Sequence, residues 1–339
     1  MSTDQETFVD QLRVDDTPRK ERRRRRAQGP ELENRRTVPL SRRIRHSWQL
    51  YLLLLPALVW VALFAYWPMY GIQIAFRDFT PVGGITGSDF VGWKHIEKFL
   101  HSYNFWPLLR NTLVLALYEL VAGFPIPIIL ALALNAVRQR YFSRIVQLIT
   151  YAPNFISVVV VVGILVMLLD PQTGIVPHTF ELLGIAPPAF LTDPGWFRHT
   201  YVWSGIWQTA GFSAIIYLAA LSSVPPELHE AAKVDGASHL RRMWHIDVPA
   251  ILPIAIVLMI LNVGSIMSVG FEKVLLMQNP LNLTTSQVID TYVYEVGLKS
   301  PIPQYSYATA IGLFRSVVGL VLLVAVNALS RRITKAGLF

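Results

Sequence analysis

Two ionisable residues, Glu119 and Arg315, stand inside otherwise apolar stretches of the sequence. A charged side chain at the depth of a lipid bilayer is costly unless it meets a partner or a water-filled path. Both lie a similar distance into their stretches, so at ~1.5 Å of helix per residue their depths match. We predict that they form an ion pair, or that one of them lines a path for a polar solute. The alternative is structural: Arg315 reaches the membrane surface alone, and Glu119 is protonated among packed helices.

A second group of polar residues lies in a short loop between two apolar stretches, residues 224–249. Pro226 suits the first turn of a helix, because its missing N–H would be unpaired there. Glu230 favours the positive N-terminal end of that helix, and Gly236 suits the left-handed residue that ends it. An amphipathic helix is expected to start near Ser238. The sequence therefore predicts two short helices around a glycine turn, which together form a rigid docking element.

The sequence also excludes several kinds of chemistry. It has no cysteine, which rules out disulfides, zinc–thiolate sites and cysteine nucleophiles. Its 8 histidines show no spacing typical of a metal site, and it has no Gly-Lys-Ser/Thr phosphate-binding loop. We expect no metal and no cofactor on this chain, and no ATP hydrolysis by it.

The elements that would position these residues are membrane helices. Of the 339 residues 53% are hydrophobic and 15% are charged, whereas soluble domains typically carry about 25% charged residues. Six apolar stretches each exceed the roughly 20 residues that cross a bilayer. They cover residues 50–76, 107–137, 145–169, 200–223, 248–271 and 305–330. The predicted fold class is an all-α membrane protein with six transmembrane helices.

The positive charges predict the orientation of these helices. Thirteen of the 30 Lys and Arg residues precede residue 48, and the loops 138–144 and 224–247 are short and basic. Positive loops face the cytoplasm, so we expect both termini inside and a multi-pass protein of the cell membrane. Residues 1–45 are read as a disordered basic tail and residues 46–339 as the six-span domain. The tail lacks the features of a cleavable signal, and nucleic-acid binding by it is disfavoured.

The loop also carries a recognisable motif. Glu230-Ala231-Ala232, three residues, Gly236, nine residues and then Ile246-Asp247-Val248-Pro249 resemble the EAA loop of binding-protein-dependent ABC importer permeases. The family has Leu where this chain has Val248. The resemblance implies a coupling helix that docks on a cytoplasmic ATPase. The coupling residues it implies are Glu230, Ala231, Ala232, Asp235, Gly236, Ile246 and Pro249.

Less specific segments resemble one carbohydrate branch of these permeases, which takes oligosaccharides from polysaccharide breakdown. They are Tyr66–Tyr70, Phe90–Gly92, Asn111-Thr112, Phe124–Pro127, Asp170–Gly174, Ile206–Gln208 and Gly270–Lys273. This resemblance implies a sugar or oligosaccharide as the transported solute. A permease of the same type for glycerol phosphate, a polyamine or a metal chelate is the alternative.

A sugar path needs aromatic faces and planar amides. The candidates are Glu119, Asn154, Trp207, Gln208, Asn262 and Arg315. Each has a plainer interpretation, because tryptophan is common at membrane interfaces and small polar residues join helices. Pro125 and Pro127 interrupt the second stretch, and they predict either a simple kink or a helix broken at a cavity.

The resemblance also implies partners. We expect a second permease subunit on a different chain, two ATPase subunits that hold ATP and Mg²⁺, an extracytoplasmic solute-binding protein and the lipid bilayer. A membrane enzyme is disfavoured because no cluster of His, Asp and Glu converges within the apolar stretches. A passive channel is disfavoured because a pore needs no ATPase-docking loop.

Overall fold

The computed structural model describes residues 48–137, 139–264, 266–268 and 270–334. Within these residues all regular elements are helical, and strand-like pairing is limited to a single bridge between Arg77 and Phe90. The chain divides into two compact units, Met1–Pro68 and Met69–Phe339, which are described separately. The predicted all-α fold is confirmed. The predicted tail of residues 1–45 lies outside the described residues.

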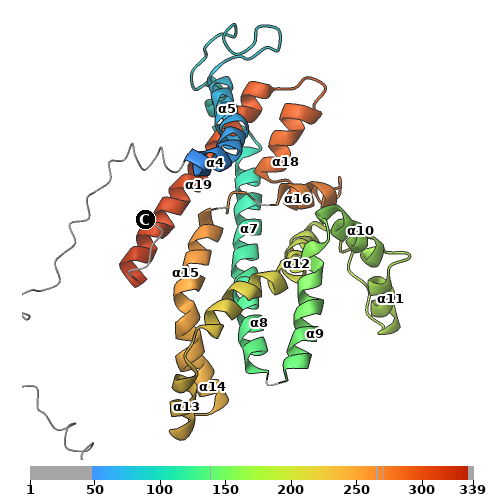
Figure 1. Cartoon of the computed structure of the whole chain (residues 1–339). Coiled ribbons are helices and arrows are strands. Elements are labelled where there is room, and N and C mark those ends of the chain that lie inside the picture. Colours follow the sequence, from blue (N-terminus) through green and yellow to red (C-terminus); the bar gives the residue numbers. More distant parts are fainter. Residues whose placement is uncertain (1–47, 138, 265, 269, 335–339) are drawn as a thin grey trace, which may run out of the picture. The chain divides into compact units, whose positions relative to one another are not determined.

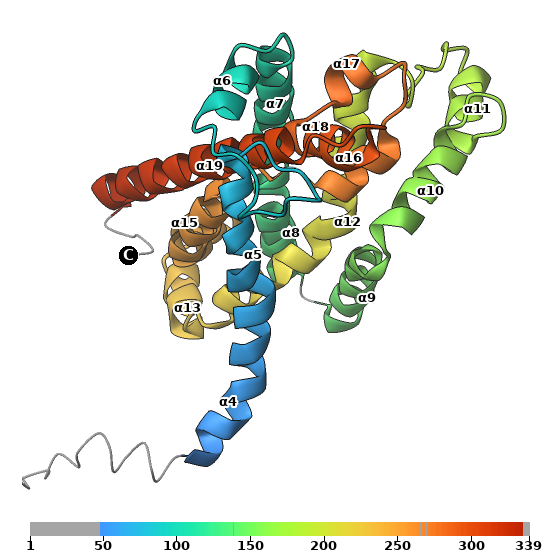
Figure 2. The same ribbon diagram turned by 90° about the horizontal axis from the view of Figure 1, so that it is seen from above.

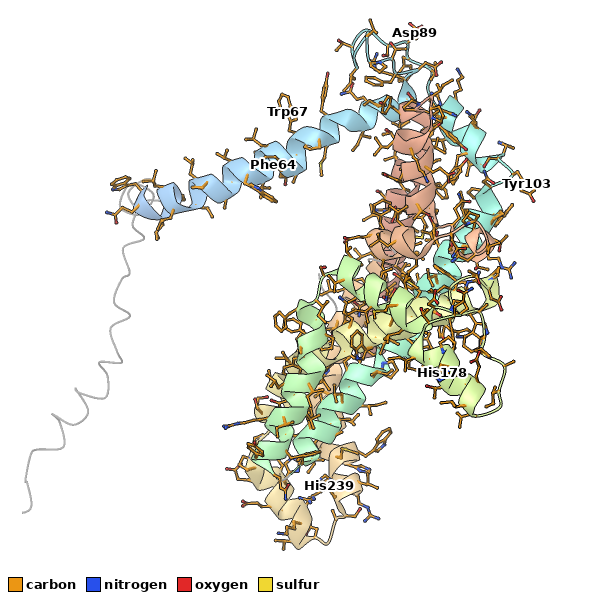
Figure 3. All side chains as sticks on the ribbon, turned by 90° about the vertical axis from the view of Figure 1, so that its right-hand side faces the viewer. Phe64, Trp67, Asp89, Tyr103, His178 and His239 are labelled. Atoms are coloured by element: carbon orange, nitrogen blue, oxygen red, sulfur yellow. The ribbon has the colours of Figure 1, made fainter. Side chains whose placement is uncertain are left out.

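The described part of the first unit is one apolar helix. α4 (Trp48–Val61) continues into a π-helical turn, η2 (Ala62–Tyr66), and then into α5 (Trp67–Met69) (Figure 1). No residue of this helix is charged. Side chains such as Phe64 and Trp67 project from it and are exposed (Figure 3). A helix that is apolar on all sides suits a lipid environment.

Among its described residues, the second unit contains four further apolar helices that are long enough to span a membrane. In chain order they are α7 (Phe105–Gly123) continued by α8 (Pro125–Ala136), α12 (Pro194–Ser222), the helical run His239–Gly264 that ends in α15 (Val248–Gly264), and α19 (Tyr305–Thr334). Figure 1 shows α7 and α8 end to end, so the span continues past Gly123 and the prolines after it without a break. With residues 48–76, five of the six predicted spans are apolar helices.

Two span boundaries differ from the prediction. Span four begins at Pro194 and not at residue 200, because the Asp193 side chain caps the helix and accepts a hydrogen bond from Gly195 N–H at 2.8 Å. Arg198 and His199, which follow the first turn, hid the helix start from a hydropathy argument. Span five ends at Gly264 and not at residue 271.

The third predicted span is bent. α9 (Arg140–Tyr151) and η4 (Ala152–Phe155) lead into α10 (Val158–Leu169), and the two halves meet at 103°. Figure 2 shows these helices following one another along one edge of the second unit. The expectation of a continuous helix over residues 145–169 was therefore wrong. The pair counts as a sixth span if the bent halves cross together.

The bend has a local cause. Pro153 removes a backbone donor, and Ile156 and Ser157 are extended. The Ser157 hydroxyl accepts a hydrogen bond from Val160 N–H at 3.4 Å and starts α10 afresh. The Ile156 carbonyl lies at the break and accepts a hydrogen bond from Gln208 Nε2 at 3.0 Å. A helix can be broken at membrane depth only where the backbone groups freed by the break find other hydrogen-bond partners.

α12 forms the centre of the second unit and packs against α7, α8, α9 and α15. Towards its C-terminal end, Ala214 is buried with Ala131 of α8 and Ile251 of α15. Towards its N-terminal end, Val202 is buried with Leu115 of α7. Residues on α12 are therefore held in fixed positions relative to three other spans.

Short helices connect the spans. They are α6 (Lys94–Leu100), α11 (Ile175–Leu182), α16 (Phe271–Met277), α17 (Leu283–Ser286), α18 (Ile289–Tyr294) and η6 (Glu295–Lys299), while η3 (Tyr70–Phe76) is the last part of the first span. Phe99 of α6 and Ile289 of α18 are buried in one cluster with Leu108 of α7 and Ile311 of α19. The connections are thus packed onto the ends of the spans.

The segment Asp170–Gly174 forms a tight turn after α10. Thr173 donates to Asp170 Oδ1 from its backbone N–H (2.8 Å) and its hydroxyl (2.9 Å), and Gln172 N–H donates at 2.9 Å. These hydrogen bonds hold the pKa of the Asp170 carboxyl below its usual range. A Cβ on Gly174 would stand 2.5 Å from the carbonyl oxygens of Asp170 and Leu168. The motif therefore has a structural role here.

Candidate functional site

The loop between spans four and five begins with a short helix, α13 (Pro226–Val234), whose proline occupies the first turn. Gly236 follows in the left-handed conformation, with φ +75°. Its N–H donates to the Lys233 carbonyl at 3.1 Å, and Ala237 N–H donates to the Ala232 carbonyl at 2.9 Å. This pair of bonds defines a Schellman motif, which needs a left-handed residue at the position of Gly236. The predicted helix and glycine turn are confirmed.

The second helix of the loop also forms as predicted. The Ser238 hydroxyl accepts a hydrogen bond from Arg241 N–H at 3.3 Å and caps α14 (His239–Arg242). A π-helical turn, η5 (Met243–Asp247), carries the chain into α15. The second half of the loop is thus a continuous helical extension of span five.

The predicted coupling residues lie mostly at the surface. Glu230, Ala231, Asp235, Gly236 and Pro249 are exposed, and Ala232 and Ile246 are partly buried. Beside them Val234, Leu240 and Trp244 are exposed apolar side chains. Exposed apolar groups in a short polar loop suit contact with another protein. The coupling role of these residues stays a prediction.

One contact in the loop was not predicted from the sequence. His229 Nε2 lies 3.2 Å from Asp247 Oδ1 and so joins α13 to η5. The Asp247 side chain is 7% exposed. Both residues line a cavity of about 520 Å³, together with Arg242 of the same loop and Asn135 of α8. The contact fixes the first helix of the loop against the start of span five.

A second cavity, of about 370 Å³, lies among α7, α8, α12 and the end of span five. Two of the predicted path residues line it, Glu119 of α7 and Asn262 of α15. Hydroxyl groups on α12 line it as well, from Thr209 and Ser213. A volume of this size falls in the range of about 300–1,000 Å³ typical of small-molecule sites.

The other predicted path residues lie elsewhere. Gln208 is buried and donates to the Ile156 carbonyl, so it stabilises the bend of span three. Trp207 is exposed on α12, and Asn154 lies in η4. None of the three lines the 370 Å³ cavity. Gln208 illustrates the plainer interpretation of a polar residue in a span, as a link between helices.

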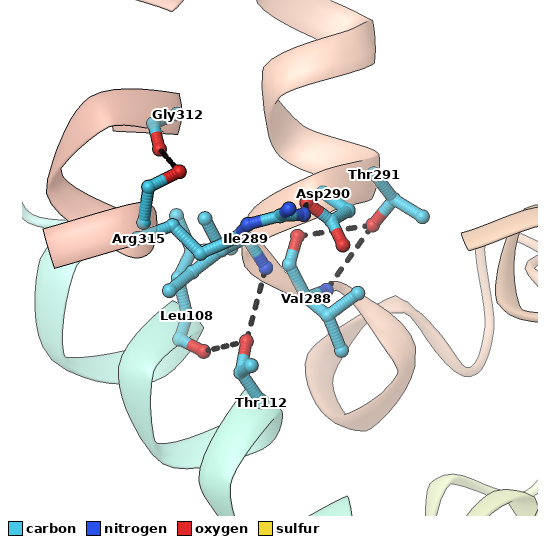
Figure 4. A network of polar contacts seen from close by, with 9 residues as sticks. Leu108, Thr112, Val288, Ile289, Asp290, Thr291, Gly312 and Arg315 are labelled. Atoms are coloured by element: carbon cyan, nitrogen blue, oxygen red, sulfur yellow. Dashed lines mark hydrogen bonds and ion pairs between the residues drawn. The ribbon is translucent and has the colours of Figure 1, made fainter. Parts of the chain in front are cut away.

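Arg315 does not pair with Glu119. Its guanidinium forms an ion pair with Asp290 of α18, and this corrects the predicted pairing (Figure 4). Asp290 is brought there because Ile289 N–H donates to the Thr112 hydroxyl of α7 at 3.0 Å. The side chains of Arg315 and Asp290 are 28% and 14% exposed. The partner lies in a connection between spans, so a search of the apolar stretches alone misses it.

This ion pair gives a prediction for stability. Asp290→Ala or Arg315→Ala leaves one charge half-buried without its partner, which costs about 1–3 kcal/mol. We expect each single variant to lower the thermal midpoint of the purified complex by several degrees. The double variant should lose less than the sum of the two single losses. Strictly additive losses would contradict the pair, and a Glu119→Gln/Arg315→Ala combination supplies the additive control.

Glu119 has a different cationic neighbour, Lys273 of α16. The Lys273 ammonium is buried, donates to the Tyr201 carbonyl at 2.9 Å and stands 4.8 Å from the centre of the Tyr201 ring. A Cβ on Gly205 would stand 3.2 Å from Lys273 Nζ and 3.9 Å from Glu119 Oε1. Glu119 and Lys273 interact electrostatically. The glycine leaves the space in which the two opposite charges approach each other.

Comparison with known proteins supplies an independent line of evidence. The chain is 44% identical over 290 residues to the polygalacturonan/rhamnogalacturonan transport system permease protein YteP of Bacillus subtilis (strain 168), covering 86% of this chain and 90% of that protein. It is 43% identical to protein LplB of the same organism, covering 87% and 92%. It also matches a chain in the crystal structure of a bacterial ABC transporter involved in the import of the acidic polysaccharide alginate. The TM-score is 0.80 at 41% identity, covering 87% of this chain and 99% of that one.

Residues 123–335 match the family described as binding-protein-dependent transport system inner membrane component. The match includes the loop with its Schellman turn and spans four to six. The resemblance drawn from the motif and the result of the comparisons therefore agree. This chain belongs to the family of binding-protein-dependent ABC importer permeases of the inner membrane.

Proposed function

We propose that the chain is a permease subunit that moves a sugar or oligosaccharide from a binding protein into the cytoplasm. The main structural support for a carbohydrate solute is the 370 Å³ cavity, whose wall contains hydroxyl groups, an amide and one accessible carboxylate. Such groups can accept hydrogen bonds from sugar hydroxyls, and the hydroxyl and amide groups can also donate to them. The names of the relatives, which refer to polygalacturonan, rhamnogalacturonan and alginate, support a carbohydrate.

The cavity also disfavours the non-sugar solutes. Among its described lining residues there is no Lys, Arg or His, so a glycerol phosphate would meet the Glu119 carboxylate without a cation. A polyamine carries several positive charges and would find a single carboxylate among the described lining residues. A metal chelate finds no group of three metal-ligating side chains among the described residues.

The proposed mechanism couples this cavity to a separate ATPase. ATP and Mg²⁺ bind to two ATPase subunits at the cytoplasmic side, and their closure moves the loop of residues 224–249. The loop is continuous with span five, and His229 ties α13 to Asp247 at its base. A push on α13 is therefore transmitted to span five and to Asn262, which lies in the cavity wall.

The proposed assembly has further parts. A second permease subunit of similar type closes the other side of the path, and a solute-binding protein delivers the solute from outside. Both termini lie in the cytoplasm. The solute-binding protein is supported by a solved relative, a bacterial alginate ABC transporter in complex with alginate pentasaccharide-bound periplasmic protein.

Reconstitution tests the proposed function. The complex that purifies with this chain is placed in liposomes with its binding protein outside and ATP at the ATPase side. We expect ATP-dependent uptake of a labelled plant-wall oligosaccharide and no uptake of glycerol 3-phosphate or spermidine. Uptake of either non-sugar solute, with no oligosaccharide taken up, would overturn the proposal.

A further inference from the structure

The 370 Å³ cavity has one charged side chain in its described wall. Glu119 is exposed there, although it lies in the middle of α7. The other described residues of the wall are uncharged. A bound solute would therefore meet a carboxylate acceptor and no cationic donor among the described lining residues.

The cation that offsets this charge is out of reach of the cavity. Lys273 is 7% exposed and is not among the lining residues. One of its N–H groups donates to the Tyr201 carbonyl, and the ammonium stands over the Tyr201 ring. It interacts electrostatically with Glu119, and both groups lie on the side of Gly205 that its missing Cβ leaves open. The described cavity wall thus presents the carboxylate and not the ammonium.

This arrangement discriminates between sugars. A sugar hydroxyl donates to a carboxylate, and a hydrogen bond to a charged acceptor is among the stronger ones. A uronic acid ring in the same place brings a second carboxylate near the first, and like charges repel more strongly inside protein than in water. The neighbouring polar groups suit hydroxyls as well. Thr209 already donates its hydroxyl hydrogen to the Gly205 carbonyl, so its oxygen remains an acceptor.

We propose that the cavity beside Glu119 takes a neutral sugar ring and rejects a uronate ring at the same position. The proposal rests on the sugar-import function and specifies one of its subsites. It differs from what the relatives' names suggest, since polygalacturonan and alginate are acidic. In a mixed oligosaccharide, the neutral unit would occupy this cavity and the uronate units would lie elsewhere along the path.

A matched pair of probes tests this subsite. Trigalacturonic acid and its fully methyl-esterified form share rings and linkages and differ in charge. Their binding is measured by titration on the complete detergent-solubilised importer, without the binding protein. We expect the neutral ester to bind about tenfold more tightly than the acid at neutral pH.

Variants assign the effect to Glu119. Glu119→Gln keeps the shape of the side chain and should reduce the ester-to-acid ratio to within about twofold. Glu272→Gln removes an exposed carboxylate on α16, next to Lys273, and should leave the ratio unchanged. If Glu119→Gln weakens the complex, the wild-type ratio still decides, because it needs no variant.

The outcomes of the titration distinguish failure of the neutral subsite from failure of the proposed function. Tighter binding of the acid, or a ratio that Glu119→Gln leaves unchanged, overturns the neutral subsite but leaves sugar import standing. Binding of neither probe, together with binding of glycerol 3-phosphate, overturns the subsite and the proposed function together. A tenfold preference for the ester that disappears in Glu119→Gln supports both.

Discussion

Gly236→Val should abolish ATP-driven uptake while the chain still inserts in the membrane. Valine is strongly disfavoured at φ +75°, because its branched side chain clashes with the backbone there. The Schellman turn between α13 and α14 should therefore open at a cost of about 1–3 kcal/mol. The position itself has open space around it, so the effect comes from the backbone and not from a clash with a neighbour. We expect uptake in proteoliposomes to fall more than tenfold at unchanged membrane yield.

A glycine on the opposite side of the predicted topology provides the control. Gly184 ends α11 in the same Schellman geometry, with φ +72° and open space around it. Its N–H donates to the Glu181 carbonyl at 2.9 Å, and Ile185 N–H donates to the Phe180 carbonyl at 2.9 Å. Gly184→Val introduces the same strain far from the loop, so uptake should persist. Equal losses in both variants would contradict a special role for the loop.

Charge reversal on α13, the predicted coupling helix, gives a second variant of the same test. Glu230→Lys changes an exposed side chain and leaves the turn at Gly236 intact. It should therefore preserve the fold and reduce stimulation of the ATPase by loaded binding protein. Normal uptake by both Glu230→Lys and Gly236→Val would refute coupling through this loop.

Gly211→Ala should prevent α12 from packing against α9. A Cβ on Gly211 would stand 2.0 Å from the Thr150 carbonyl oxygen and 2.4 Å from its carbonyl carbon. Both are backbone atoms of α9, so the two helices would have to separate. Close approach through glycine is a common basis of helix association in membranes. We expect little folded complex after detergent extraction, measured by size-exclusion chromatography.

Gly163→Ala makes the same chemical change where there is room. Gly163 lies within α10, and nothing stands within 4 Å of its added Cβ. Alanine has the higher helix propensity, so this variant should fold at least as well as the wild type. Equal folding of Gly211→Ala and Gly163→Ala would show that the approach of α9 to α12 does not determine packing.

Local features of the structure were predictable from the sequence. The helix that begins at Pro226, the turn at Gly236 and the cap at Ser238 depend on neighbouring residues only. Long apolar segments likewise identify spans, because each one satisfies its own backbone hydrogen bonds. The loop motif could be located because its physical signals all fall within one stretch of sequence.

Features that depend on distant contacts were not predictable in this way. The partner of Arg315 lies in α18, a connection that folds back between α7 and α19 through the Ile289–Thr112 hydrogen bond. Lys273 reaches Glu119 from another connection, past Gly205. The depths of Glu119 and Arg315 along their helices do not reveal that a connection folds back between the spans.

Cross-linking tests the coupling loop most directly, because the chain has no cysteine of its own. Val234 is 88% exposed at the end of the coupling helix, and Val82 is 101% exposed in the first connection. Single Val234→Cys and Val82→Cys variants of the assembled importer are treated with a photoactivated, thiol-linked reagent. We predict a cross-link to the ATPase from position 234 and none from position 82. An importer that takes up solute but cross-links its ATPase from position 82, or not from position 234, would contradict docking through this loop.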